Sequence, residues 1–392
     1  MSAEYNDILM AMESAMVSER EINPLSYDPT DYVTIQEVVS HIINRKKTIE
    51  VKDLLPQLSV NGTVIQDPME NYLKRPANSA SALKQILKTP LHYWCYLHEK
   101  IPIQSKKAFE FGTFCHMAFL EPELFDALIV EPNYSLSTTE GVKKSVEFWE
   151  KTLKGVMKKS GKRHLLSNAK SAVKRAGLTI TKIDGLRRYR EELSKRAGKI
   201  CVGEVDKRKI ELVRRHYYTY GGGILPALMK GSANEVSFYG TDEGTGLPVK
   251  IRPDGLQLEE NIGCNAIISF KTTSAEDIDK FAYDAAKFQY QMAEGMYLEV
   301  ASQVTGRRFN AVICVMLQNV EPFLPAVFMY SPEDLQNGRY RYQCAIADVK
   351  KCIDSKTFPG FDAKAEFGDM GIIQLNLPEW SKRELKPVDI EL

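Results

Sequence analysis

The amino-acid sequence predicts an α/β fold in which a mixed central sheet is flanked by helices. Three observations support this prediction: short β-rich runs between residues 234 and 270, helical runs on both sides of them, and a further buried run at 309–317. Strands that lead into a helix and then into another strand are typical of such folds. The chain has 392 residues, 44% of them hydrophobic, so it can bury a sizeable core in one large domain or two ordinary ones.

Residues 1–75 differ from the rest and are predicted to form an N-terminal helical appendage. They are acidic, and their apolar clusters at 33–43 and 51–58 are short. Pro76 and Asn78 then mark a boundary. We therefore expect the main domain to span 76–392, and we assign no chemistry to the appendage.

Two helices are expected next. Ser79 or Ser81 can serve as the N-cap of a helical run at 82–87. A compact apolar helix follows at 112–120 and carries one imidazole, that of His116. A histidine on an apolar helix is usually a core residue, so its role depends on what lies beside it.

Residues 141–216 are helical in pattern and strongly basic. Between Lys143 and Arg215 there are 23 lysines and arginines against 8 acidic residues. Such a segment is either a phosphate-binding surface or a set of solvated helix faces. Trp149 on this segment, and Tyr217 and Tyr218 just after it, are expected to pack more often than to stack on bases.

After a run of three glycines the pattern changes to strands. We expect β-strands at 234–239, 247–252 and 266–270, with a turn at 240–246 between the first two. A helix from 275 to about 300 should follow, then strands at 309–317 and 325–330, and a final helix that starts at Ser331.

Three polar residues of this region suggest hydrolytic chemistry. Glu235 lies in the first strand, Asp254 follows the second, and Lys271 ends the third. Asp254 comes near Lys271 if the second and third strands pair as a hairpin. Carboxylates hold Mg²⁺, a bound metal activates water and stabilises charge on a phosphate, and a lysine can orient that water. Spacing alone also fits a turn aspartate and a solvated lysine.

Five segments, taken in order, resemble the RecE-like exonucleases (exonuclease VIII) of the PD-(D/E)xK nuclease superfamily. The resemblance covers roughly 79–361. The segments are SASALKQILKTPLHYW at 79–94, GTFCHMAFLEPELF at 112–125, GTGLPVKIRPDGL at 244–256, SFKTT at 269–273 and YQMAEGMY at 290–297.

The resemblance implies a role for each site residue. Glu235 and Asp254 would be metal ligands, His116 would lie near a metal, and Lys271 would act on the attacking water. The implied cofactor is Mg²⁺, with Mn²⁺ as an alternative. Predicted DNA contacts come from residues near the site and from the basic segment: Arg252, Tyr290, Gln291, Arg214 and Arg215.

The resemblance further implies a 5′–3′ exonuclease that digests linear duplex DNA from its ends. Such enzymes form a ring-shaped homo-oligomer and have a single-strand annealing protein as partner in phage-type recombination modules. The chain lacks a signal-peptide pattern and has no run near 18 apolar residues, so we expect a cytoplasmic protein without membrane contact. Its seven scattered cysteines fit reduced thiols in such a compartment.

This chain departs from the family at two positions. Ser269 stands where an acid is expected two residues before the lysine, and Ala293 stands where a glutamine is expected. Serine cannot supply a negative metal ligand. Some restriction endonucleases of the superfamily resemble this pattern and take the acid from the following helix, where Glu294 is the best candidate. Weaker candidates are Glu276 and Glu299, and the polar role of the glutamine could pass to Gln289 or Gln291.

Two alternatives therefore stay open. The chain could be a catalytically weakened DNA-binding or scaffolding protein that keeps the fold, as Ser269 suggests, or it could be an endonuclease. It contains no Walker P-loop, no HExxH zinc motif and no GxSxG elbow, which excludes the enzyme classes that depend on them.

Overall fold

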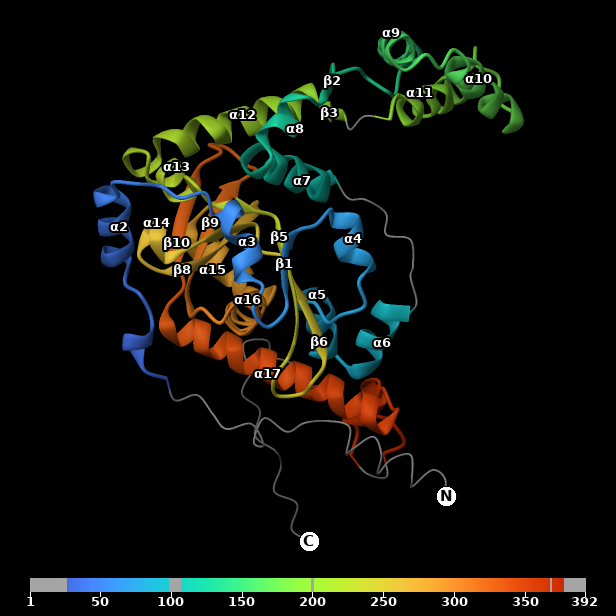
Figure 1. Cartoon of the computed structure of the whole chain (residues 1–392). Coiled ribbons are helices and arrows are strands. Elements are labelled where there is room, and N and C mark those ends of the chain that lie inside the picture. Colours follow the sequence, from blue (N-terminus) through green and yellow to red (C-terminus); the bar gives the residue numbers. More distant parts are fainter. Residues whose placement is uncertain (1–26, 99–106, 199–200, 367–368, 377–392) are drawn as a thin grey trace, which may run out of the picture.

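A five-stranded mixed sheet forms the centre of the computed structural model, which describes residues 27–98, 107–198, 201–366 and 369–376 (Figure 1). Its strand order is β10-β9-β8-β7-β4. β8 and β9 are parallel, and the other pairs are antiparallel. The bounds are β4 (Ala233–Asn234), β7 (Gly255–Gln257), β8 (Asn265–Thr273), β9 (Phe309–Gln318) and β10 (Pro325–Met329). The predicted mixed sheet is confirmed.

A second, antiparallel sheet has the order β1-β5-β6. Its strands are β1 (Thr63–Gln66), β5 (Val236–Thr241) and β6 (Pro248–Ile251). The hairpin considered between 247–252 and 266–270 does not form, because β6 pairs with β5 while the short strand β7 pairs with β8. Pro253 interrupts the run between β6 and β7, since proline has no N–H to donate to a strand partner.

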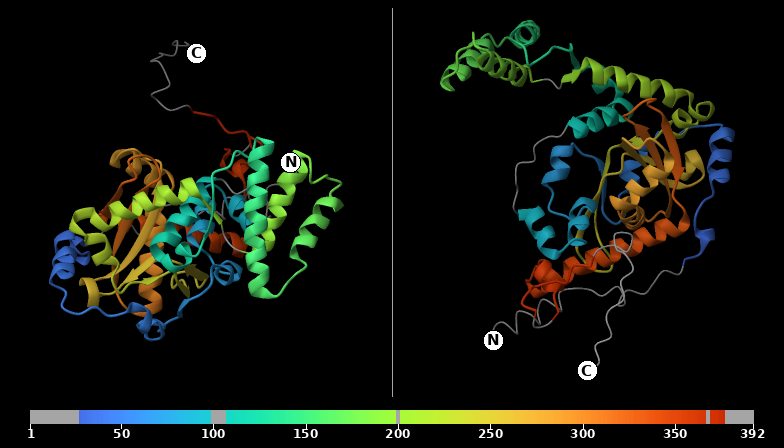
Figure 2. Two further views of the ribbon diagram at one scale, coloured as in Figure 1. Left: turned by 90° about the horizontal axis from the view of Figure 1, so that it is seen from above. Right: turned by 180° about the vertical axis from the view of Figure 1, so that it is seen from behind.

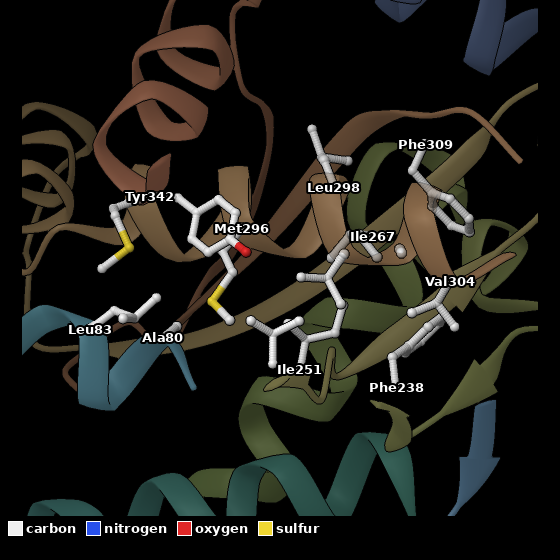
Figure 3. Packing of buried hydrophobic residues seen from close by; sticks show 14 of the residues in the cluster. Ala80, Leu83, Phe238, Ile251, Ile267, Met296, Leu298, Val304, Phe309 and Tyr342 are labelled. Atoms are coloured by element: carbon white, nitrogen blue, oxygen red, sulfur yellow. The ribbon is translucent and has the colours of Figure 1, made fainter. Parts of the chain in front are cut away.

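Helices cover both faces of the central sheet. One core cluster joins the sheet to α3 (Val51–Leu58), α5 (Ala80–Ile86), α16 (Tyr290–Thr305) and α17 (Pro332–Ser355). A second cluster, on the other face, joins it to α2 (Ile35–Asn44), α7 (Lys107–Leu120), α12 (Glu204–Thr219) and α13 (Ile224–Met229). Figure 3 shows side chains of the first cluster, among them Leu83, Ile267 and Met296, packed against one another.

Strand β8 divides its side chains between these two clusters. Ile267 belongs to the first, whereas Ile268 and Phe270 belong to the second. Because side chains alternate along a strand, Ser269 and Lys271 face the same side as Ile267, toward α16. The same alternation therefore fixes the face on which the polar residues of β8 can act.

Two predicted elements are broken by residues in the left-handed backbone region. The helix expected at 275–300 is two helices, α15 (Ile278–Lys287) and α16, separated where Gln289 has φ 54°. The strand expected at 234–239 is split into β4 and β5 at Glu235, which has φ 55°. Neither conformation continues a regular helix or strand.

Part of the predicted N-terminal appendage contributes to the core. β1 pairs with β5, and Val51, Leu55 and Leu58 of α3 lie in the same cluster as α16. Residues 1–26 lie outside the described residues, and the boundary at 75 stays a prediction. The remaining elements of this half are η1 (Pro29–Asp31), α4 (Met69–Lys74), α6 (Pro90–His98) and α8 (Pro122–Asp126).

Three helices of the basic segment form an arm that stands apart from the sheets (Figures 1 and 2). The arm comprises α9 (Thr139–Ser160), α10 (Leu165–Arg175) and α11 (Ile183–Ala197). It has its own core around Trp149, so that tryptophan packs as expected. β2 (Ile129–Glu131) and β3 (Cys201–Gly203) pair at its base, and α12 leads back to the body.

Short elements complete the described chain: η2 (Tyr220–Gly222), α14 (Glu259–Ile262) and η3 (Phe361–Lys364). Across the ranges that the structure describes, no helix combines the length and apolar character needed to span a bilayer. The final helix, α17, begins at the predicted place, with Ser331 as its N-cap.

Candidate metal-dependent active site

Two crossings between the sheets bring Glu235 and Asp254 together. Glu235 lies where the chain passes from β4 to β5, and Asp254 lies where it passes from β6 to β7. The Glu235 N–H donates a hydrogen bond of 3.1 Å to the carbonyl oxygen of Asp254. A residue other than glycine in the left-handed region costs of the order of 1 kcal/mol or more, and such strain is often retained at functional sites. Glu235 is a residue of this kind.

Helix α7 adds an imidazole to this pair. The His116 Nδ1 lies 3.4 Å from the Asp254 Oδ1. Gly112 allows α7 to approach β8, since a Cβ there would lie 3.0 Å from the Thr272 Oγ1. One ligand atom from each of His116, Glu235 and Asp254 lies within 4.8 Å of the others. We call these three residues the metal trio.

The chemistry of the trio suits a divalent cation. Two carboxylates and an imidazole are ligands that Mg²⁺, Mn²⁺ or Zn²⁺ can use. Two ligands of one Mg²⁺ ion lie at most about 4.2 Å apart, twice the usual Mg–O distance. The observed separations therefore require only small side-chain shifts to hold an ion.

A second polar group lies on the adjoining face of β8. The Ser269 hydroxyl lies 2.8 Å from both carboxylate oxygens of Glu294, and the Lys271 Nζ lies 3.4 Å from its Oε1. Glu294 is 1% exposed and faces the sheet rather than solvent. Its carboxylate thus lies beside the position where the family has an acid, although it is not one of the metal trio.

The other candidates for the missing acid are placed elsewhere. Glu299 lies 3.7 Å from Arg339 in an ion pair. Glu276 precedes α15, and its backbone carbonyl accepts a hydrogen bond from Gln318. The amide of Gln289 accepts a hydrogen bond of 3.1 Å from Arg341. Of the acids considered, Glu294 alone has a contact with Ser269 or Lys271 in the described structure.

Helices α16 and α17 cross closely beside Glu294. A Cβ added at Gly295 would lie 2.3 Å from the Gly338 carbonyl carbon, and one added at Gly338 would lie 2.0 Å from the backbone carbonyl oxygen of Gln291. Only glycine permits this approach of two backbones. With Gly295 against α17, the preceding residue Glu294 lies about 100° around the helix and contacts Ser269 of β8.

The charges of the trio are coupled. Burial alone would lower the pKa of His116, but the Asp254 carboxylate outweighs it and raises that pKa. Burial would raise the pKa of Asp254, but the charges of His116 and Lys271 and the Phe270 N–H outweigh it and lower that pKa. In the metal-free protein the pair therefore favours imidazolium beside carboxylate.

The remaining charged groups are also compensated. Burial and the Asp254 charge raise the pKa of Glu235, although Arg252 lies 2.7 Å away and opposes this rise. Burial would lower the pKa of Lys271, but Glu294 and Asp254 outweigh it and raise that pKa. Lys271 is thus held as a cation, suited to binding negative charge rather than accepting a proton.

The predicted DNA contacts fall in two places. Arg252 and Tyr290 lie at the site: Arg252 pairs with Glu235, and the Tyr290 ring lies 5.4 Å from the Lys271 Nζ. Gln291 lies in the first turn of α16. Arg214 and Arg215 lie on α12, where Arg214 pairs with Asp126 at 3.2 Å. The structure does not bring these last two to the trio, and all five DNA roles stay predictions.

A groove leads to the metal trio from α4 and α6. Its volume is about 910 Å³, and all three trio residues line it. Basic and apolar side chains both line it, and five of its large apolar residues are exposed: Met69, Leu73, Tyr96, Leu97 and Ile353. The sequence does not indicate this apolar lining of the groove, because no motif marks exposed apolar residues that only the fold brings together.

Comparisons with known proteins give a family match and a similar solved structure. Residues 195–368 match the family described as a PDDEXK-like domain of unknown function (DUF3799). A search of curated proteins finds no match. A crystal structure of a provisionally named exonuclease from Eubacterium rectale is 11% identical, with a TM-score of 0.43, and the match covers 83% of this chain and 97% of that chain. The family match over residues 195–368 is consistent with the PD-(D/E)xK core that the sequence predicted.

Proposed function

We propose that this protein is a metal-dependent deoxyribonuclease and, more specifically, a 5′–3′ exonuclease on linear duplex DNA. The observation that carries the proposal is the metal trio, with Glu294 and Lys271 beside it, at the end of a groove in a PDDEXK-like fold. A volume of about 910 Å³ lies within the range of roughly 300–1,000 Å³ typical of sites for small ligands. It therefore has room for a short stretch of one strand.

Each residue of the site has its own role in the proposed reaction. Asp254 and Glu235 would hold the cation, with His116 as a nitrogen ligand and Glu294 as a further carboxylate. A bound Mg²⁺ or Mn²⁺ ion supplies an activated water and offsets phosphate charge. Lys271 donates to the phosphate or orients the water, because Glu294 and Asp254 keep it protonated. Asp254 is itself oriented by the Phe270 N–H, which donates to its Oδ2 at 2.6 Å.

The arm would hold the duplex outside the groove. Between residues 139 and 197 it carries 17 lysines and arginines against 6 acidic residues. A hollow of about 980 Å³ on α9 is lined partly by basic side chains: Lys151, Lys154, Lys158 and Arg163. Such a surface attracts phosphates without reading sequence. A homo-oligomeric ring and an annealing protein as partner remain part of the proposal through the RecE-like resemblance.

A second candidate function is supported by one observation. Glu235 is paired with Arg252 at 2.7 Å, Glu294 with Lys271 at 3.4 Å and Asp254 with the His116 imidazole at 3.4 Å, so all three carboxylates already have cationic partners. A protein that binds DNA through this fold without cleaving it would show the same pairs. The distinction requires a direct assay of hydrolysis.

The test uses the full chain with linear and covalently closed circular duplex DNA, in Mg²⁺, Mn²⁺ or chelator. We expect metal-dependent loss of linear DNA only, released from the 5′ end, and no loss in Asp254→Asn or Lys271→Met. Glu299→Gln, on the same helix as Glu294, should retain activity and serves as the control. Cleavage of circles would support the endonuclease, and binding without hydrolysis would support the second candidate.

A further inference from the structure

Lys84 is a half-buried lysine that the proposed function does not use. It lies in α5, near the site. Its Nζ lies 5.3 Å from the centre of the Tyr290 ring, and the Lys271 Nζ lies 5.4 Å from the same centre. Two ammonium groups therefore share one aromatic ring, and one of them belongs to the proposed active site.

Lys84 lacks the ionic partner that its neighbour has. Lys271 has Glu294 at 3.4 Å, whereas within the described ranges no carboxylate oxygen comes within 4.0 Å of the Lys84 ammonium. The ring of Tyr290 attracts a cation but cannot neutralise it. An unpaired charge held away from water is costly, so the arrangement has room for an anion.

The charges around Lys84 do not neutralise its ammonium group. Burial and the repulsion of Lys271 lower the pKa of Lys84 to about 8, and Glu294 opposes the shift only in part. Lys84 thus remains mainly a cation at neutral pH, in a place where the nearest other cation destabilises it. A bound phosphate would relieve both effects.

We propose that Lys84 binds the phosphate next to the one that is cleaved and so positions the strand. The inference rests on the proposed function, because it assigns a second phosphate to the same site. Lys271 acts on the cleaved phosphate, and the shared ring keeps the two ammonium groups close together. A strand that reaches Lys271 with one phosphate therefore brings the neighbouring phosphate to Lys84.

The experiment removes either partner of the contact. Lys84→Met keeps the length of the side chain and removes its charge. Lys280→Met is the matched control, since Lys280 also lies over a tyrosine ring, 5.7 Å from the centre of Tyr283, but is exposed and paired with Asp284. Each protein is assayed on DNA in which one linkage beside the cleaved one, on either side, is a neutral methylphosphonate.

In the wild type and in Lys280→Met, the neutral linkage on one side should raise KM by about 10-fold or more, as expected for a lost charged hydrogen bond. In Lys84→Met the same linkage should change KM by less than about twofold, because its partner is already absent. Lys84→Arg should regain the sensitivity. Thermal unfolding checks that the variants are folded, and Lys84→Gln replaces the methionine variant if that one is not.

An equal penalty for the neutral linkage in Lys84→Met and wild type would overturn the assignment. If the wild type cleaves no DNA, the proposed function fails, and binding of the same oligonucleotides in Ca²⁺ decides the question for Lys84. A penalty in wild-type binding that vanishes in Lys84→Met still supports the contact. An unchanged penalty rejects it.

Discussion

A carboxylate placed on the strand should replace the one that reaches the site from the helix. The perturbation is Glu294→Gln, alone and combined with Ser269→Asp. In the wild type, the Ser269 hydroxyl lies 2.8 Å from both carboxylate oxygens of Glu294. Glutamine keeps the shape of Glu294 and can still accept a hydrogen bond from this hydroxyl, but it removes the negative charge. Aspartate at 269 returns that charge from the position where the family has its acid.

The distances set the expected size of each effect. A carboxylate stabilises the reacting phosphate only through the cation that it helps to hold, and loss of one such electrostatic contribution costs about 100-fold or more in turnover, so Glu294→Gln should lose at least that much. The double variant should recover about 10-fold or more of the loss. Ser269→Asp alone puts two carboxylates about 4 Å apart, where like charges repel by about 4 kcal/mol at an effective dielectric constant of 20. That variant should therefore be the least stable of the three.

The assay measures release of nucleotides from linear DNA in Mg²⁺, with thermal unfolding of each variant in parallel. Glu299→Gln, a half-buried acid one helical turn further along α16, controls for a general effect of neutralising that helix. Full activity in Glu294→Gln would refute the reasoning, because the helix acid would then be dispensable. A double variant no better than Glu294→Gln would show that the two positions are not equivalent.

Three further predictions follow from the same structure. In the metal-free protein, the His116–Asp254 pair contributes stability that is full below the unfolded histidine pKa of about 6.5 and is lost as pH rises through the raised folded pKa. Thermal unfolding of wild type and His116→Ala at pH 5–9 should converge at the alkaline end, and a constant difference would contradict the coupling. Gly338→Ala should lower the free energy of unfolding by about 3 kcal/mol, because its Cβ would lie 2.0 Å from the Gln291 oxygen. Urea denaturation checks this, and a change below about 1 kcal/mol would be inconsistent with the tight crossing. Neutralising three arm lysines should reduce the slope of log DNA affinity against log salt by up to about 3, and an unchanged slope would remove the arm from the interface; the three are Lys151, Lys154 and Lys158.

The fold class could be predicted because its signals were local, whereas the three residues of the trio were assigned from the resemblance, and their metal-binding role stays a prediction. Short β-rich runs gave strands, and the resemblance placed Glu235, Asp254 and His116 in the order that the family uses. The structure brings all three within 4.8 Å. The reason given for the approach of Asp254 was nevertheless wrong, since a separate short strand, β7, carries it to β8.

What the sequence could not supply was the geometry between distant elements. Glu294 was one of three acids that could replace the missing ligand, and only the packing of α16 against the sheet shows that it faces Ser269. Lys84 follows the buried Leu83 on a short helix, and no pattern separates it from a solvated lysine. Its proposed role depends on contact with Tyr290, which lies more than 200 residues away along the chain.

The proposed activity depends most on a divalent cation bound between the crossings of the two sheets. Anomalous diffraction from crystals soaked in Mn²⁺ tests this directly, because it locates the ion without any assumption about activity. We predict a peak in contact with Asp254 and Glu235, with the His116 imidazole turned toward it, and no peak there in Asp254→Asn. A wild-type crystal that shows no Mn²⁺ at this position at saturating concentration would contradict the account.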